Sequence, residues 1–245
     1  MGFIEKKTLD TVFLVIKHGA ICEEAKSAKD GFREITVINP KTNQQVTKFI
    51  REFTAVEGYV TDLLWYDTEK TYETRYLGYK LKMDVDGTPA VLDLPFKSRP
   101  YDIFVKLAEN IDFNKPVKFS AWHDRKEDRT AFCAWQDDAV VRWAYTKENP
   151  HGCPPAVKDD VTGEWDFRAQ RKWLKERMDN AIIPAIKLAQ EKREAVKAEQ
   201  AAQAAQATQQ KAKTAAASNA PDQNDPWGEY SPPIEEPPDY NDIPF

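Results

Sequence analysis

The sequence has few of the residues that build metal, cofactor or disulfide sites. Its 245 residues include three histidines, three methionines and three cysteines (Cys22, Cys133, Cys153). No two cysteines form a CxxC pair, and His151-Gly152-Cys153 has no second ligand pair at zinc spacing. We therefore expect reduced thiols and no metal or other cofactor.

Long apolar runs and catalytic motifs are also missing. No segment approaches the roughly 18–20 apolar residues of a membrane helix, and the N-terminus lacks an apolar stretch of the signal-peptide type. We expect a soluble, intracellular protein with no membrane partner. No P-loop, GxSxG, HExxH or GxGxxG motif occurs. Asp137-Asp138 and Asp159-Asp160 would suit a magnesium-dependent nuclease, but adjacent carboxylates in turns are more often solvated charges, so we do not expect an enzyme.

Charge is distributed unevenly along the chain. Residues 1–150 hold 23 basic and 24 acidic side chains, residues 151–221 hold 12 and 9, and residues 222–245 hold none and seven. Seven of the sixteen prolines fall in the last 25 residues. This asymmetry predicts a globular body over 1–145, a linker and basic helical segment over 146–217, and a disordered, acidic, proline-rich tail over 218–245.

Alternating apolar residues and turn signals predict a β-rich body. An N-terminal strand extension is expected first, and Asp86-Gly87 marks a hairpin. The expected strands are Val12–Ile16, Ile35–Val37, Phe49–Leu64 with a bend at Gly58, Tyr76–Met83, Ala90–Leu94, Val117–Trp122 and Ala131–Gln136, with a helix over Tyr101–Asn110. From the long bent strand onward this is the element order of an OB-fold. We predict a mainly β (α+β) chain: a five-stranded OB-fold barrel with an N-terminal strand extension, a C-terminal helix and a disordered acidic tail.

Helical periodicity begins near Asp166. We expect one apolar stripe, and Pro184 should kink or split the helix because it has no amide proton. The stripe comprises Phe167, Leu174, Met178, Ala181 and Ala185. Residues 185–217 have few large aliphatic side chains, which predicts a solvated or partly disordered spacer.

The chain ends with a peptide suited to docking. Ile243 and Phe245 can fill an apolar pocket while acidic residues steer the approach. The alternative is a solubilising tail whose last residues are incidental. The docking residues would be Asp239, Asp242, Ile243, Pro244 and Phe245.

This ending, Asp242-Ile243-Pro244-Phe245 after a proline-rich acidic run, resembles the C-terminal tip of bacterial-type single-stranded DNA-binding proteins. With the predicted body, the chain resembles bacteriophage-encoded single-stranded DNA-binding proteins with one OB-fold. The resemblance implies coating of single-stranded DNA during replication, recombination and repair in the cytoplasm of a bacterial host, with the tip recruiting replication and recombination proteins. This tip has fewer aspartates than is usual in the family.

Single-strand binding requires aromatic faces for stacking and cations for phosphates. The outward-facing strand positions and the polar loops Trp65–Arg75 and His123–Thr130 supply both, and we expect Trp65, Tyr76 and Trp122 to stack. The candidate residues are Trp65, Tyr66, Lys70, Tyr72, Arg75, Tyr76, Lys80, Lys82, Lys118, Trp122, His123, Arg125, Lys126, Arg129, Lys48 and Arg51.

Each candidate has a structural alternative. Trp65 can close the end of the barrel, and the loop arginines can pair with Asp124, Glu127 and Asp128. At the level of function, the alternatives are a protein–protein adaptor of the replication machinery whose body does not bind DNA, and a nuclease. A monomer and self-association along DNA are both compatible with the sequence.

Overall fold

The computed structural model describes residues 10–17, 19–38, 42–70 and 74–218. The chain divides into two compact units, Met1–Val196 and Lys197–Phe245. The first unit contains the sheet and the sites described below. None of the helices in the described part of the chain has the length and apolarity needed to cross a membrane.

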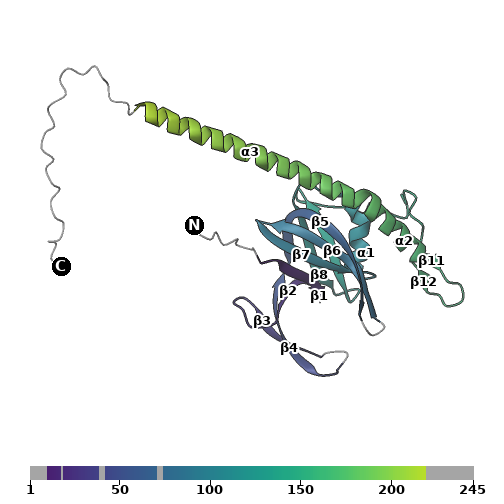
Figure 1. Ribbon diagram of the computed structural model, residues 1–245. Helices are drawn as coiled ribbons and strands as arrows, with labels where there is room; N and C mark the ends of the chain where they lie inside the picture. Colours follow the sequence, from purple (N-terminus) through teal and green to yellow (C-terminus); the bar gives the residue numbers. More distant parts are fainter. Residues whose placement is uncertain (1–9, 18, 39–41, 71–73, 219–245) are drawn as a thin grey trace, which may run out of the picture. The chain divides into compact units, whose positions relative to one another are not determined.

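One ten-stranded sheet dominates the first unit (Figure 1). Its strands lie in the spatial order β10-β9-β8-β5-β6-β7-β1-β2-β4-β3. Neighbouring strands are antiparallel except β1 and β7, which are parallel. The strands are β1 (Val12–Lys17), β2 (Ala20–Ala25), β3 (Arg33–Ile38), β4 (Gln45–Phe53), β5 (Ala55–Lys70), β6 (Thr74–Val85), β7 (Thr88–Pro95), β8 (Val117–Asp124), β9 (Arg129–Gln136) and β10 (Ala139–Val140).

The predicted five-stranded OB-fold barrel is wrong. The predicted element order does occur, as β5, β6, β7, α1, β8 and β9, but these strands belong to a larger mixed sheet that does not close. The reason lies at β7. One edge of β7 pairs with β6, and the other edge pairs in parallel with β1, through Phe13 and Val91, and not with β9 at the other end of the predicted barrel. The N-terminal strands thereby extend the sheet beyond the expected barrel, since a barrel closes only when its two edges pair.

Gly58 marks the place where β5 changes partners. Residues Ala55–Gly58 pair with β8, and pairing with β6 begins at Tyr59. A Cβ at Gly58 would lie 2.4 Å from the carbonyl oxygen of Asp84, so only glycine allows this approach. The predicted bend at Gly58 therefore coincides with the change of partner.

The predicted polar loop Trp65–Arg75 is mostly strand. β5 runs to Lys70 and β6 begins at Thr74, so the two form one long hairpin. The predicted Asp86-Gly87 hairpin is confirmed, with φ values of 50° and 81° that suit a tight turn of this kind.

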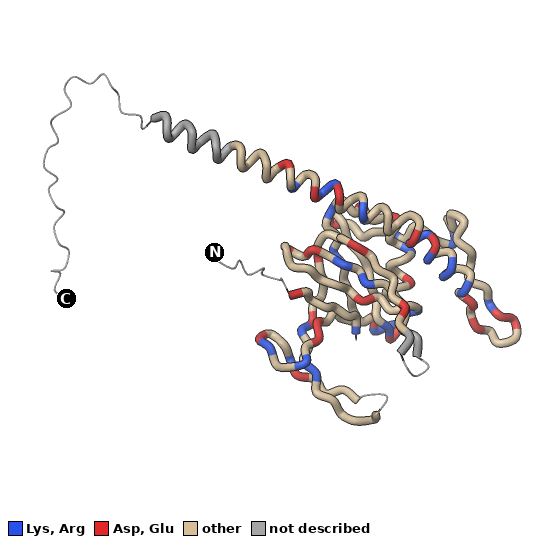
Figure 2. Tube along the Cα trace, viewed as in Figure 1, with Lys and Arg blue, Asp and Glu red and all other residues tan. Residues whose placement is uncertain are grey.

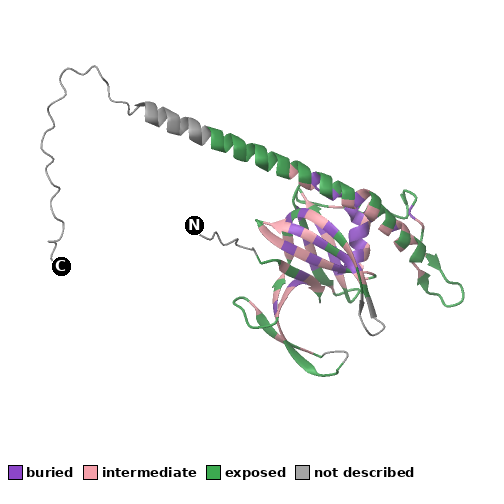
Figure 3. Cartoon of the chain, viewed as in Figure 1, coloured by how far each residue is buried: buried purple, intermediate pink, exposed green. Residues whose placement is uncertain are grey.

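Helix α1 (Arg99–Leu107), followed by the 3₁₀ turn η1 (Ala108–Asn110), covers the inner face of the sheet. The Ser98 side chain caps its first turn by accepting a hydrogen bond from the Tyr101 amide. Tyr101, Phe104 and Leu107 are fully buried against sheet residues such as Tyr79 and Phe119. Figure 3 shows this buried core running through the sheet and α1.

After β10 the chain forms a small hairpin, β11 (Val157–Lys158) and β12 (Trp165–Asp166). Helix α2 (Arg168–Arg177), the π-helical turn η2 (Met178–Ile182) and α3 (Ile183–Ser218) follow without a break. The wide π-helical turn lies just before Pro184, where a regular helix would clash with the proline ring.

The π-helical turn also shifts the predicted apolar stripe. After Leu174 and Met178 the buried positions are Ile182, Ile186 and Ala189, and not Ala181 and Ala185. A π-helical turn holds more residues than an α-helical one, so the buried face moves along the sequence. Residues 185–217, predicted as a spacer, belong to α3.

Candidate nucleic-acid interface

Helix α2 carries a concentrated positive charge. Five of its ten residues are Lys or Arg, and Glu176 is its one acidic residue. Arg168, Arg171, Lys172 and Lys175 follow helical i, i+3, i+4 and i+7 spacing and so share one side of the helix. Leu174 of the same helix is buried in the core. Figure 2 shows basic residues gathered along α2, whereas the strands carry both signs.

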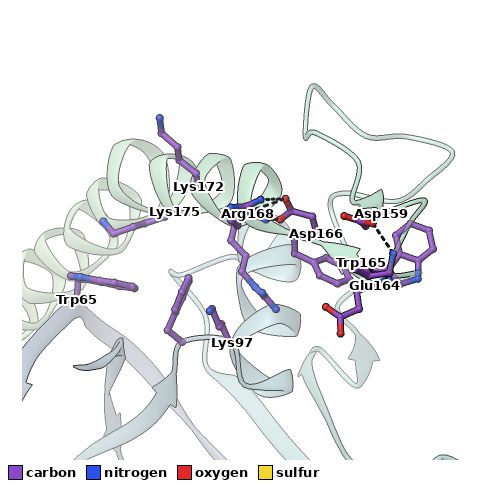
Figure 4. Close-up of a pocket in the computed structure, with 13 residues that line it drawn as sticks. Trp65, Lys97, Asp159, Glu164, Trp165, Asp166, Arg168, Lys172 and Lys175 are labelled. Carbon is purple, nitrogen blue, oxygen red and sulfur yellow. Dashed lines mark hydrogen bonds and ion pairs between the residues drawn. The ribbon is translucent and has the colours of Figure 1, made fainter. Parts of the chain in front are cut away.

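This basic side of α2 borders a cavity of about 690 Å³, which we call the α2 cleft (Figure 4). Its walls come from α2, the β11–β12 hairpin, Trp65 in the second half of β5 and the turn after β7. Five cations, three carboxylates and four aromatic rings line it together with Thr162: Lys97, Arg168, Arg171, Lys172, Lys175, Asp159, Glu164, Asp166, Trp65, Phe96, Trp165 and Phe167.

Trp65 is fixed in one wall of the cleft. Its ring meets Tyr79 and Phe96 edge-on, with centroids 5.0 and 5.9 Å apart. The Lys175 ammonium lies 4.7 Å from the Trp65 ring centroid. Asp179 holds this arrangement, since it pairs with Lys175 and accepts a 3.2 Å hydrogen bond from the Tyr79 hydroxyl. Trp65 therefore offers the cleft a ring capped by a cation.

Arg171 has a structural role in the same wall. Its guanidinium donates two hydrogen bonds to Asp102 of α1, at 3.1 and 2.8 Å, and these raise the pKa of Arg171. It also lies over the rings of Phe96 and Phe167, 5.9 and 5.2 Å from their centroids. Arg171 therefore connects α2 to α1 and to the rings of Phe96 and Phe167.

Two of the three carboxylates are occupied by local contacts. Hydrogen bonds from the Arg168 side chain and amide lower the pKa of Asp166 to about 2. Asp159 accepts hydrogen bonds from the amides of Val161 and Thr162, which lower its pKa. Lys97 and Lys172 are both exposed at the cleft, whereas Arg168, Arg171 and Lys175 pair with Asp166, Asp102 and Asp179.

Trp165 is the most open ring of the cleft. It lies on β12, immediately before α2, and 57% of its surface is exposed. An indole exposed to this extent is accessible to a planar ligand. The α2 cleft therefore combines an exposed indole with the exposed ammonium groups of Lys97 and Lys172.

Among the residues predicted from sequence, Trp65 lines the α2 cleft. Tyr66, Tyr76, Lys80 and Lys82 alternate with the inward-facing positions and lie on the other face of the β5–β6 hairpin. The Lys80 ammonium lies 5.6 Å from the Tyr66 ring centroid.

Carboxylates lie among these hairpin residues. Lys82 pairs with Asp62 at 3.1 Å. Burial, and then the nearby Asp93 carboxylate, raise the pKa of Tyr66. The cations of the hairpin's outer face therefore lie among carboxylates.

The remaining described candidates lie on other parts of the sheet and do not line the α2 cleft. Lys118 and Trp122 are exposed on β8, and Arg125 and Lys126 are exposed in the turn that follows. Several others have acidic partners. At the predicted loop, His123 pairs with Asp128 at 3.4 Å and Arg129 pairs with Glu127, and pairing was expected for the arginines there. On β4, Lys48 pairs with Glu24 at 2.9 Å and Arg51 with Glu23 at 2.6 Å.

Some predicted residues lie outside the described parts of the chain. Tyr72 is one of them. For Lys70, at the end of β5, and Arg75, near the start of β6, the structure describes the backbone and not the side chain. The docking peptide also lies outside the described residues: Asp239, Asp242, Ile243, Pro244 and Phe245.

Most residues that line the α2 cleft were not among those predicted from the sequence to bind DNA. Trp165, Phe167, Arg168 and Lys172 fall within eight consecutive residues, and the basic i, i+3, i+4, i+7 spacing was a usable signal. The sequence predicted a basic helical segment with an apolar stripe here, but no binding site.

Comparisons of the chain with protein-family models, curated proteins and solved structures found no match. Within the described residues, no group of three or more His, Cys, Asp or Glu side chains is arranged to hold a metal ion.

Proposed function

We propose that this protein binds single-stranded DNA without sequence preference and that the α2 cleft is a principal contact surface. The observation that carries the proposal is the meeting of the exposed Trp165 indole and exposed cations in one cavity. Unpaired bases expose flat apolar faces that stack on aromatic side chains, while the phosphates attract Lys and Arg. Such contacts do not depend on base identity, because every base has a face that can stack.

The residues of the cleft divide these tasks. Trp165 supplies an open indole for stacking, and Lys97 and Lys172 supply exposed ammonium groups for phosphates. Trp65 and Arg171 are held by their neighbours and shape the wall. The body as a whole is near neutral, so binding depends on this local charge and on stacking.

The remaining parts of the proposal rest on the sequence. The acidic segment 222–245 would recruit replication or recombination proteins, and the setting would be bacteriophage DNA metabolism in a bacterial cytoplasm. In this proposal the protein is a binding protein and not an enzyme.

Fluorescence anisotropy with labelled oligo-dT tests the binding surface. Trp165→Ala should raise Kd at least about fivefold, since stacking contributes roughly 1–3 kcal/mol per base. Lys172→Glu should raise Kd at low salt and flatten the dependence of log K on log salt by at least about 0.7, the value for one phosphate contact on a single strand.

Two variants serve as controls. Lys187→Glu reverses an exposed charge on α3, and Trp122→Ala removes an exposed indole on β8; neither residue lines the cleft. Both should bind nearly as wild type. If Trp122→Ala weakens binding and Trp165→Ala does not, the binding surface lies on β8. Absence of binding by the wild type would favour a protein–protein adaptor, and magnesium-dependent shortening of the oligonucleotide would indicate a nuclease.

A further inference from the structure

A second cavity adjoins the α2 cleft. Its volume is about 910 Å³, and Trp165 and Phe167 line both cavities. The second cavity lies against the segment that follows β10, and we call it the Trp143 cavity. Its other walls include Trp143, Tyr145, Cys153 and Pro154. The two cavities therefore adjoin at Trp165 and Phe167.

Trp143 repeats the chemistry found in the cleft. Its ring is 47% exposed, and the Lys106 ammonium of α1 lies 5.2 Å from the ring centroid. Lys175 and Trp65 form the same kind of pair in the α2 cleft. An ammonium beside a partly open indole suits a nucleotide, because the indole stacks on the base and the ammonium meets its phosphate.

The segment that carries Trp143 is held on both sides. The Ala144 amide donates a 2.8 Å hydrogen bond to the Lys106 carbonyl, and the Asn110 side chain donates one of 3.1 Å to the Arg142 carbonyl. Behind it, the buried Tyr145 packs edge-on against Trp173 of α2, with centroids 5.0 Å apart. The backbone that carries Trp143 is therefore held in place on both sides of the residue.

From these contacts we infer that the Trp143 cavity is a second stacking subsite for the same single strand. The inference rests on the proposed function: a strand bound in the α2 cleft passes over Trp165, and a later base stacks on Trp143 beside Lys106. An oligonucleotide too short to pass Trp165 gains nothing from this subsite. The length of the oligonucleotide therefore separates the contributions of the two cavities.

The test compares oligo-dT of about 4 and about 12 nucleotides, which span the site sizes common among single-strand binders. The full-length Trp143→Ala variant should bind the short oligonucleotide as wild type does and the long one at least about fivefold more weakly. Trp143→Phe retains an aromatic face and should recover most of this loss. Trp135→Ala removes another partly exposed indole, on β9 and outside both cavities, and should bind both lengths normally.

Three outcomes would overturn the inference while leaving the proposed function standing. The first is unchanged binding of both lengths by Trp143→Ala. The second is an equal loss for both lengths, which would place Trp143 in the first subsite. The third concerns the tryptophan fluorescence of Trp143, obtained as the difference between wild type and Trp143→Phe. If a proline-rich peptide changes this fluorescence and the long oligonucleotide does not, the cavity binds peptide and not DNA. Absence of wild-type binding at either length would instead refute the proposed function.

Discussion

The Lys175 ammonium lies 4.7 Å from the centroid of the Trp65 ring and thereby joins helix α2 to the β5–β6 hairpin. Asp179 completes the contact by pairing with Lys175 and accepting a hydrogen bond from Tyr79 of β6. The cleft therefore has a wall built from two segments that are distant in sequence. Its geometry depends on contacts that can be measured separately from DNA binding.

A double-mutant cycle measures the Lys175–Trp65 contact. Lys175→Ala and Trp65→Leu, alone and together, should show a coupling of about 0.5–1 kcal/mol in the free energy of unfolding, the usual magnitude for a cation–π pair. Urea denaturation of the four proteins provides the values. Strict additivity of the two changes would show that the ammonium and the ring do not interact.

Two arginines of α2 should differ in their effect on stability. The Arg171 side chain is 19% exposed and that of Arg168 is 91% exposed, although each pairs with a carboxylate. Arg171→Ala should lower the free energy of unfolding by roughly 1–2 kcal/mol, because it removes charged hydrogen bonds and leaves Asp102 without this partner. Arg168→Ala should change stability little, since solvent screens its pair. Equal effects in urea denaturation would contradict the assignment of Arg171 as the tie between α2 and α1.

Asp166 should remain ionised at unusually low pH. Hydrogen bonds from Arg168 lower its pKa from 3.8 to about 2 in the folded protein. Because the folded form binds the proton less readily than the unfolded form, this contact stabilises the fold above about pH 4, and the contribution is lost as the pH falls through about 2. Carboxyl NMR titration of the wild type should give this low value. Arg168→Ala should return the pKa of Asp166 toward 3.8, and an ordinary value in the wild type would contradict the contact.

Gly58 should not tolerate a methyl group. In Gly58→Ala the new Cβ would lie 2.4 Å from the backbone carbonyl oxygen of Asp84, and a paired strand cannot easily move away. We expect a loss of about 1–3 kcal/mol in the free energy of unfolding, as for other overpacked sites. Gly87→Asn is the comparison, because Gly87 has open space around it and a left-handed φ that asparagine tolerates. Similar thermal stability of Gly58→Ala and wild type would show that β5 does not pass this close to β6.

Local pattern predicted individual strands well and their neighbours poorly. The alternation in Tyr76–Met83 and the Asp86-Gly87 turn depend on nearby residues, and both features occur as β6 and the turn before β7. The parallel pairing of β1 with β7 joins Phe13 to Val91, and no local pattern encodes that choice. The predicted barrel failed at this point.

The site shows the same division. The hairpin's alternation correctly separated Tyr79, which is buried, from Lys80, which is exposed. The alternation could not predict the contact of Trp65 with Lys175, because that contact depends on the packing of α2 against β5. The π-helical turn that precedes Pro184 likewise shifted the buried stripe, and periodicity alone assumes regular helix.

The most direct test is ultraviolet cross-linking of the full-length protein to oligo-dT, followed by mass spectrometric identification of the linked peptides. Binding in the α2 cleft predicts cross-links in the peptide that carries Trp165 and Phe167, and Trp165→Ala should greatly reduce them. Cross-links confined to β8, to the β8–β9 turn or to the β3–β4 hairpin, with none near Trp165, would contradict the proposed interface.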